Sequence, residues 1–227
     1  MLVMSSQSAP ATPRHPPASL GFNLAGIAVL ALLLAVGAAY LLDEMGRTSR
    51  TPTPALEDGN PIVQTISGRE LTIPTAWFRY GEQIRDGFTN QIDLTLMFAP
   101  EGATPLPVQV MLLPRSRART SSALLDAVYL HQFGDETLTG IPGLVGKPLG
   151  AAAGYEGERV WYDPLSANAF VAKCMAPIEP GAPEQCVRTV YLPSGIAAVY
   201  VFDAKALQSW RQFDTQMKLW LEKIGAW

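Results

Sequence analysis

Residues 186–227, CVRTVYLPSGIAAVYVFDAKALQSWRQFDTQMKLWLEKIGAW, contain the pattern that decides the fold. Two apolar segments, Cys186 to Leu192 and Ile196 to Phe202, flank the tight-turn signal Pro193-Ser-Gly195 and predict a β-hairpin. After Asp203, which can cap a helix, apolar residues recur at intervals of three and four, as in an amphipathic helix. A hairpin followed by a helix that can cover it predicts an α+β fold.

The predicted C-terminal helix carries a broad apolar face. Its members are Leu207, Trp210, Phe213, Met217, Trp220, Leu221 and Ile224. Lysine, arginine and glutamine side chains fall on the opposite side, so we expect the apolar face to pack on the sheet. An aromatic stripe of this kind is typical of a domain core, and the alternative is a groove for a cofactor or a lipid.

Other segments with regular structure lie upstream. Gln91 to Phe98 alternates strictly between apolar and polar residues, as a half-buried strand does. Ser121 to Phe133 has helical spacing, with Ser121 or Ser122 as its cap, whereas Gly140 to Gly154 predicts an exposed connection. Further strands are expected at Ile62 to Ile66, Arg69 to Pro74, Pro107 to Leu113, Glu158 to Tyr162 and Asn168 to Cys174. We therefore predict a mainly antiparallel β-sheet with a mid-chain helix and a C-terminal helix.

The chain has two cysteines, Cys174 and Cys186, which are too far apart for a CxxC redox pair. They fall at neighbouring ends of predicted strands, across a connection rich in proline and glycine. A structural disulfide between them is the simplest interpretation, and it requires an oxidising compartment. The alternative is a pair of buried free thiols in a domain that faces the cytoplasm.

Residues 20–42, LGFNLAGIAVLALLLAVGAAYLL, form an apolar run without a charged side chain. A bilayer core about 30 Å thick needs roughly 20 such residues in a helix that rises about 1.5 Å per residue. The run predicts one transmembrane helix, a signal anchor in the inner membrane with the N-terminus in the cytoplasm and the following domain in the periplasm. The alternative is a cleavable signal peptide, for which Gly37, Ala38 and Ala39 supply small residues.

This anchor divides the chain into four predicted parts. Residues 1–19 are proline-rich and predict a disordered tail, and residues 43–60 predict a polar juxtamembrane linker. The remaining residues, 61–227, are enough for one exported globular domain with its own core.

Two surfaces are candidates for contacts with partners. Ala31, Ala35 and Ala39 recur every four residues and predict a face on which a second membrane helix could pack, the alternative being a lipid-facing anchor. Arg115, Arg117 and Arg119 concentrate positive charge and could contact an anionic lipid or protein surface, the alternative being a solvated loop.

The sequence offers little support for catalysis, and we expect no catalytic, cofactor-binding or metal-binding residues. His131 is the one histidine of the predicted domain, and no strand-turn-helix nucleophile motif accompanies it. The stretch GIPGLVGKP at residues 140–148 lacks the first glycine and the Ser or Thr of a phosphate loop, which argues against nucleotide binding. With a net charge of −3, the chain has no basic excess for nucleic acid.

These observations favour a non-catalytic, single-pass envelope protein that acts as an accessory or scaffold subunit by protein–protein contact. The expected partners are the membrane and another membrane or envelope protein. Two alternatives stay open: a membrane-tethered hydrolase of envelope material, and a periplasmic ligand-binding or sensor module.

Overall fold

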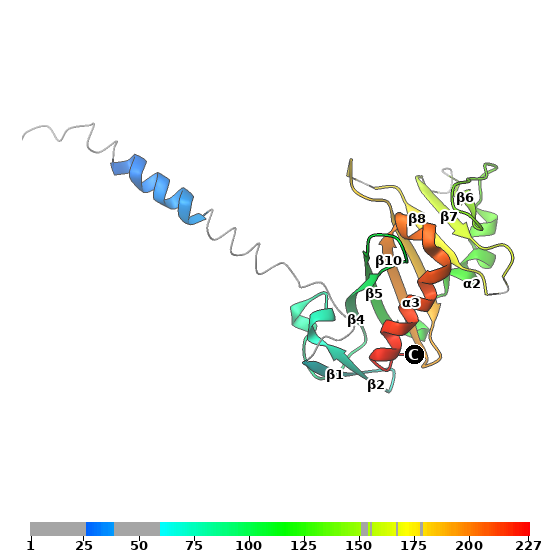
Figure 1. The fold of residues 1–227 in the computed structure, drawn as a ribbon, viewed down its shortest axis with the longest axis horizontal. Helices are drawn as coiled ribbons and strands as arrows, with labels where there is room; N and C mark the ends of the chain where they lie inside the picture. The colour runs from blue at the N-terminus through cyan, green and yellow to red at the C-terminus, as the bar shows by residue number, and fades with distance from the viewer. Residues whose placement is uncertain (1–25, 39–59, 151–153, 155, 167, 178) are drawn as a thin grey trace, which may run out of the picture. The chain divides into compact units, whose positions relative to one another are not determined.

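The computed structural model describes residues 26–38 and 60–227, apart from residues 151–153, 155, 167 and 178 (Figure 1). The chain divides into two compact units, Met1–Thr51 and Pro52–Trp227. In the first unit, residues 26–38 form a helix whose side chains are exposed. None of the helices in the described ranges combines the length and the hydropathy that crossing a membrane requires.

Parts of the predicted N-terminal organisation lie outside the described residues. These parts are the tail at residues 1–19, the two ends of the apolar run at residues 20–25 and 39–42, and the linker up to residue 59. Ala31 and Ala35 lie on the described helix, whereas Ala39 does not. The proposed packing face and the four-part division of the chain therefore stay predictions.

The second unit begins with a small three-stranded sheet in the order β2-β1-β3. The strands β1 (Pro61–Ile66) and β2 (Arg69–Pro74) form the predicted antiparallel hairpin, and β3 (Gly87–Phe88) pairs with β1 in parallel. The turn residues Ser67 and Gly68 both have positive φ. A two-residue turn with this backbone conformation matches the right-handed twist of the two strands that it joins.

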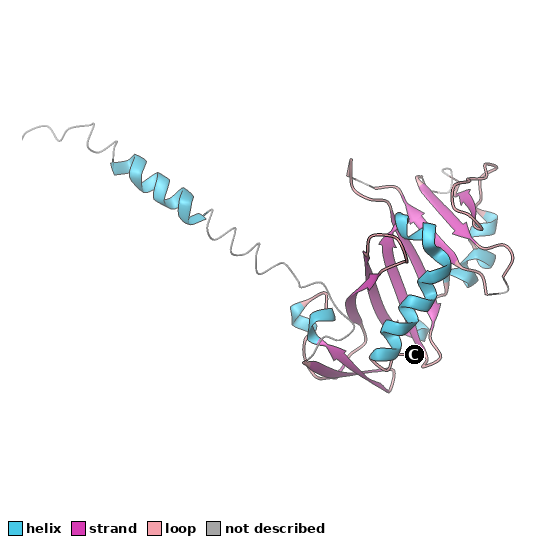
Figure 2. Cartoon of the chain, viewed as in Figure 1, coloured by secondary structure: helices cyan, strands magenta, loops and turns pink. Residues whose placement is uncertain are grey.

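A seven-stranded antiparallel sheet forms the body of this unit (Figure 2). Its strand order is β4-β5-β10-β9-β8-β7-β6. After β5 the chain crosses to the far edge of the sheet and then returns strand by strand until β10 fits between β9 and β5. The strands are β4 (Ile92–Phe98), β5 (Leu106–Pro114), β6 (Val145–Pro148), β7 (Glu158–Tyr162), β8 (Val171–Met175), β9 (Gln185–Tyr191) and β10 (Ile196–Asp203).

One strand corrects the sequence prediction. Residues 140–154, expected to be an exposed connection, contain β6, and Leu144, Gly146 and Leu149 are buried. A four-residue strand with a central glycine lacks the alternation that identifies longer strands, so its pairing with β7 decides its conformation.

The C-terminal helix packs across one face of the large sheet, as predicted (Figure 1). It begins as a 3-10 segment, η6 (Ala204–Ser209), and continues as α3 (Trp210–Lys223). Asp203 caps the start, because its carboxylate accepts a hydrogen bond from the backbone N–H of Lys205 at 2.8 Å. The predicted apolar face is buried except at Trp210, which is half-buried at the periphery of the core.

The opposite face is closed at one end by a shorter helix. The predicted helix Ser121 to Phe133 is divided into α2 (Ser121–Ala127) and the 3-10 turn η4 (Tyr129–His131). Thr120, rather than a serine, caps α2, since its hydroxyl accepts a hydrogen bond from the N–H of Ala123 at 3.2 Å. Ser121 is buried, and its hydroxyl accepts a bond from the N–H of Thr189 in β9 at 2.8 Å.

Both edge strands of the large sheet are covered by other parts of the same chain. The indole N–H of Trp220 donates to the carbonyl of Met97 at the β4 edge (2.9 Å), and the side chain of Gln216 bonds both backbone groups of Ala99. At the other edge, Leu138 forms an isolated β-bridge with Gly146 in β6. Covered edges disfavour the addition of a strand from another chain to the large sheet.

A candidate binding groove beside the disulfide

The predicted disulfide between Cys174 and Cys186 is present. The two residues lie directly opposite each other in β8 and β9, and both are buried. The two cysteines are 12 positions apart in the sequence. Their bond joins the end of β8 to the start of β9 and so closes the loop between these strands. It therefore restricts the motion of Glu184 and Gln185, which precede Cys186.

A groove opens next to this end of the sheet, with a volume of about 340 Å³. Apolar side chains of Ile141, Trp161 and Leu207 line it together with Ala204. Its polar lining comes from Arg159, Glu184, Lys205, Gln208 and Thr139. A second hollow of about 530 Å³ adjoins this depression, since Glu184, Ala204 and Lys205 line both. We call this depression the disulfide groove.

Trp161 contributes an aromatic surface to the groove because Gly146 leaves room for its ring. The two residues are partners in the register of β6 and β7. A Cβ atom at position 146 would lie only 2.6 Å from the ring of Trp161, a distance that real side chains do not adopt. The glycine that weakens the strand signal of β6 is thus required by the packing of the indole.

One wall of the disulfide groove is held against the start of α3. The indole N–H of Trp210 donates to the carbonyl of Pro142 at 3.0 Å, and the side-chain amide of Gln208 donates to the carbonyl of Gly140 at 3.3 Å. Gly143 lies against the guanidinium of Arg211 and has a φ of +85°, a backbone conformation that strains any residue with a side chain. The half-buried Trp210 therefore supports the groove wall as well as the core.

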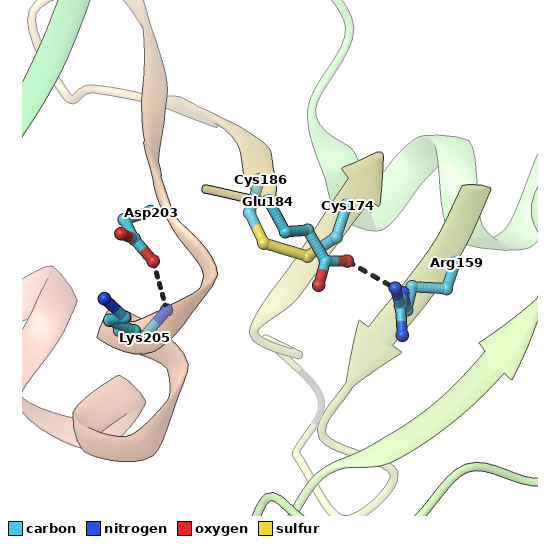
Figure 3. The surroundings of a disulfide bond; sticks show 6 residues. All are labelled: Arg159, Cys174, Glu184, Cys186, Asp203 and Lys205. Atoms are coloured by element: carbon cyan, nitrogen blue, oxygen red, sulfur yellow. Dashed lines mark hydrogen bonds and ion pairs between the residues drawn. A yellow bond between two sulfur atoms is a disulfide. The ribbon is translucent and has the colours of Figure 1, made fainter. Parts of the chain in front are cut away.

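Charges of both signs line the rim. The Nε of Arg159 lies 2.7 Å from a carboxylate oxygen of Glu184, which reaches past the disulfide toward it (Figure 3). These side chains are 36% and 23% exposed, so solvent screens the pair and its contribution to stability is small. The ammonium of the exposed Lys205 has no ion-pair partner within the part of the chain that the structure describes. A partner with a complementary charge could therefore bind Lys205 without first breaking an internal contact.

A second charged group is buried under α3. Arg188 of β9 makes two bonds to the carboxylate of Asp214 in α3, at 2.6 and 3.0 Å, and lies over the ring of Phe170. Tyr200 is its register partner in β10, and burial, together with the charge of Asp214, raises the pKa of the Tyr200 hydroxyl. This neutral tyrosine and the paired arginine attach α3 to the sheet and do not line the disulfide groove.

Sequence reasoning missed Arg188, although a signal for it exists. The residue is in phase with Cys186 and Val190 on a strand, which is the position of an inward-facing side chain. A charged residue at such a position predicts a partner of opposite charge, here Asp214 of the helix.

The three arginines singled out from the sequence do not line the groove. Arg115, Arg117 and Arg119 are exposed around η3 (Arg115–Arg117). The guanidinium of Arg115 lies 4.3 Å from the ring centre of Tyr191, and that of Arg117 donates to the carbonyl of Asn90 at 3.3 Å. The predicted role of these arginines at an anionic surface stays a prediction.

No protein-family model matches the chain, and no curated protein matches its sequence. Among solved structures, an immunity protein of the Stenotrophomonas maltophilia type IV secretion system has a TM-score of 0.50 and 11% identity. The match covers 77% of this chain and 98% of that protein. An iron-regulated outer membrane lipoprotein of Neisseria meningitidis has a TM-score of 0.46 and 8% identity, over 77% and 96% of the two chains. The first likeness shows the mixed α+β fold with its large antiparallel sheet, and nothing further.

Proposed function

We propose that this chain is a membrane-anchored envelope protein whose exported domain binds another protein through the disulfide groove, as a non-catalytic accessory subunit. The observation that carries the proposal is the construction of the groove. Its lining combines apolar side chains with charged, partly exposed ones, a mixture that protein–protein interfaces also show. A drug-sized ligand would need a pocket that encloses most of its surface, whereas this depression is open.

Rigidity of the groove supports the same conclusion. The disulfide joins the strands that lead to Glu184, and α3 holds the loop that contains Ile141. A surface that is already ordered loses little conformational entropy when a partner binds.

The anchor and the location form part of this proposal. The apolar run at residues 20–42 supports a single spanning helix, and the exposed leucine, isoleucine and valine side chains of residues 26–38 suit a lipid environment. The disulfide supports export, because such bonds persist in oxidising compartments. We infer a cytoplasmic N-terminus and a periplasmic domain, and we retain Ala31, Ala35 and Ala39 as a face for another membrane helix.

A structural neighbour suggests the kind of partner. That neighbour is an immunity protein of a secretion system. By analogy, we infer that the partner of this domain is a protein of the envelope or one that passes through it.

Site-specific photo-crosslinking of the full chain in its native envelope tests the proposal. A crosslinking amino acid at Lys205, on the rim of the groove, should form a discrete adduct with one protein. The matched control is the same substitution at Lys223, which is exposed in the last turn of α3. Equal adducts at both positions, or none at position 205, would exclude the groove as the contact surface.

Charge reversal supplies a second measurement. Lys205→Glu should lower the yield of the partner in co-purification at least several-fold, because it places a like charge beside Glu184 and removes the unpaired cation. The melting temperature should not change, because the side chain of Lys205 is exposed. Undiminished recovery of the partner would show that the rim charge does not contribute to binding.

A further inference from the structure

Half of the exposed large apolar side chains described in the second unit lie between residues 63 and 88, namely Val63, Tyr80, Ile84 and Phe88. Val63 and Phe88 belong to the small sheet, and we call these two residues the small-sheet patch. Phe88 is 92% exposed, and Val63, Tyr80 and Ile84 are 39–42% exposed. The remaining exposed apolar residues of the unit are scattered along the chain, at Leu130, Leu165, Met175 and Leu219.

The small sheet brings members of this patch onto one face. Because side chains alternate along a strand, Val63 and Thr65 point away from the buried Gln64 and Ile66. Phe88 of β3 is the register partner of Thr65 in β1, so its ring projects on the same outer face. Ile84 lies in the segment that leads into β3.

An ordered framework displays these apolar side chains. The amide of Gln64 is buried and donates to the carbonyls of Gln83 and Arg85, at 2.6 and 2.9 Å. The N–H of Val63 donates to the carboxylate of Asp86 at 2.7 Å. These bonds fix the segment between Gln83 and Phe88 on β1. The exposure of Phe88 is therefore a property of the folded structure.

The charges around the patch cancel. Arg79 and Arg85 lie in the same segment as Glu82 and Asp86, and all four are exposed. An exposed aromatic ring with an exposed valine on the same face suits the interface of a bilayer, where aromatic rings lie at the level of the head groups. The balance of charge predicts binding by apolar insertion, without dependence on anionic lipid.

The covalent link between this domain and the proposed anchor makes a lipid bilayer the favoured partner of the small-sheet patch. β1 begins at Pro61, and residues 43–60 separate it from the apolar run that we propose as the anchor. Eighteen residues of chain reach at most about 65 Å. Such a tether keeps the bilayer at a high effective concentration near the start of the domain, whereas a protein partner would have to reach the patch by diffusion.

We propose that Phe88, with Val63 on the same face of the small sheet, docks the domain on the surface of the membrane to which the chain is anchored. This inference rests on the anchor of the proposed function. Docking would restrict the orientation of the domain relative to the bilayer, and it would leave the disulfide groove to the protein partner.

A fluorescent probe at position 88 tests the docking. Because both native cysteines are in the disulfide, Phe88→Cys introduces a single free thiol that an environment-sensitive dye can label. The full chain is reconstituted into vesicles of phosphatidylcholine alone. We expect the emission to shift to the blue and to be quenched by lipids with a spin label in the shallow part of the acyl chain. Leu165→Cys, at a side chain that is also 92% exposed, is the matched control and should show neither effect.

The outcomes separate docking from anchoring. Retention of the wild-type chain in the vesicles after alkaline carbonate extraction reports on the anchor alone. The dye at position 88 is read at neutral pH, so a blue shift in a chain that carbonate releases would support docking and overturn the anchor. Identical spectra at positions 88 and 165 would overturn docking even if the anchor holds. A shift that requires added envelope protein, and is absent with lipid alone, would likewise overturn docking, because the patch would then be a protein interface.

Discussion

The two faces of the seven-stranded sheet are closed in different ways. On one face, α3 buries Phe213, Met217, Trp220 and Leu221 in a core that extends from β4 to the disulfide. On the other, the shorter α2 closes a small cluster of Leu125, Tyr129, Leu149, Val160 and Val171 near β7 and β8. From this difference we expect the long helix to contribute more to stability than the short one, which is attached by its cap and by Ser121. Four changes test this comparison.

Phe213→Ala should have the largest effect. The ring is fully buried and packs against four other aromatic rings, those of Phe98, Phe170, Tyr200 and Phe202. Removal of a buried phenylalanine side chain costs about 3–5 kcal/mol of unfolding free energy. Urea denaturation of the purified chain measures the loss. Leu219→Ala, at an exposed position of the same helix, should change it by less than about 0.5 kcal/mol.

Removal of the disulfide by the double change Cys174→Ala and Cys186→Ala should cause the second largest loss of unfolding free energy. For a loop with a separation of 12, the chain-entropy model gives a loss of about 3 kcal/mol. A reducing agent should lower the stability of the wild type by a similar amount and leave the double variant unaffected. Free thiols in the denatured, unreduced wild type would contradict the assignment of the bond.

Leu125→Ala tests the smaller cluster on the α2 face. Leu125 is 7% exposed and has few buried neighbours, so we expect a loss near the lower limit for such changes, about 2 kcal/mol. The measurement is the same urea titration as for Phe213→Ala. A loss equal to that of Phe213→Ala would show that the two faces contribute equally, against the comparison above.

Thr120→Ala should have the smallest effect. The change removes the hydroxyl that caps α2 and leaves the N–H of Ala123 without this acceptor, at a cost of about 1 kcal/mol. Amide hydrogen exchange within α2 should accelerate while that within α3 stays the same. Thr104→Ala, at an exposed residue between β4 and β5, serves as the control and should alter neither helix.

Much of the secondary structure could be predicted because its signal is local. Strict alternation identified β4, and Ile92, Leu94, Leu96 and Phe98 are all fully buried, as the pattern requires. The three- and four-residue spacing identified α3 in the same way. The disulfide was predictable because a chain with two cysteines at neighbouring strand ends allows one simple pairing.

The binding surfaces were not predictable in this way, because they depend on which strands become neighbours. The disulfide groove collects Ile141, Trp161, Glu184 and Leu207, and the small-sheet patch collects Val63 and Phe88. No periodicity links these positions, and Gly146 and Arg188 acquire their roles only from the residues packed against them. Hydrophobic period and turn residues act over a few positions, so the apolar run, the strands other than β3 and β6, the long helix and the cysteine pair could be predicted from the sequence. The insertion of β10 between β5 and β9, and the surfaces that result, could not, because pairing between distant strands is selected by the packing of the whole core.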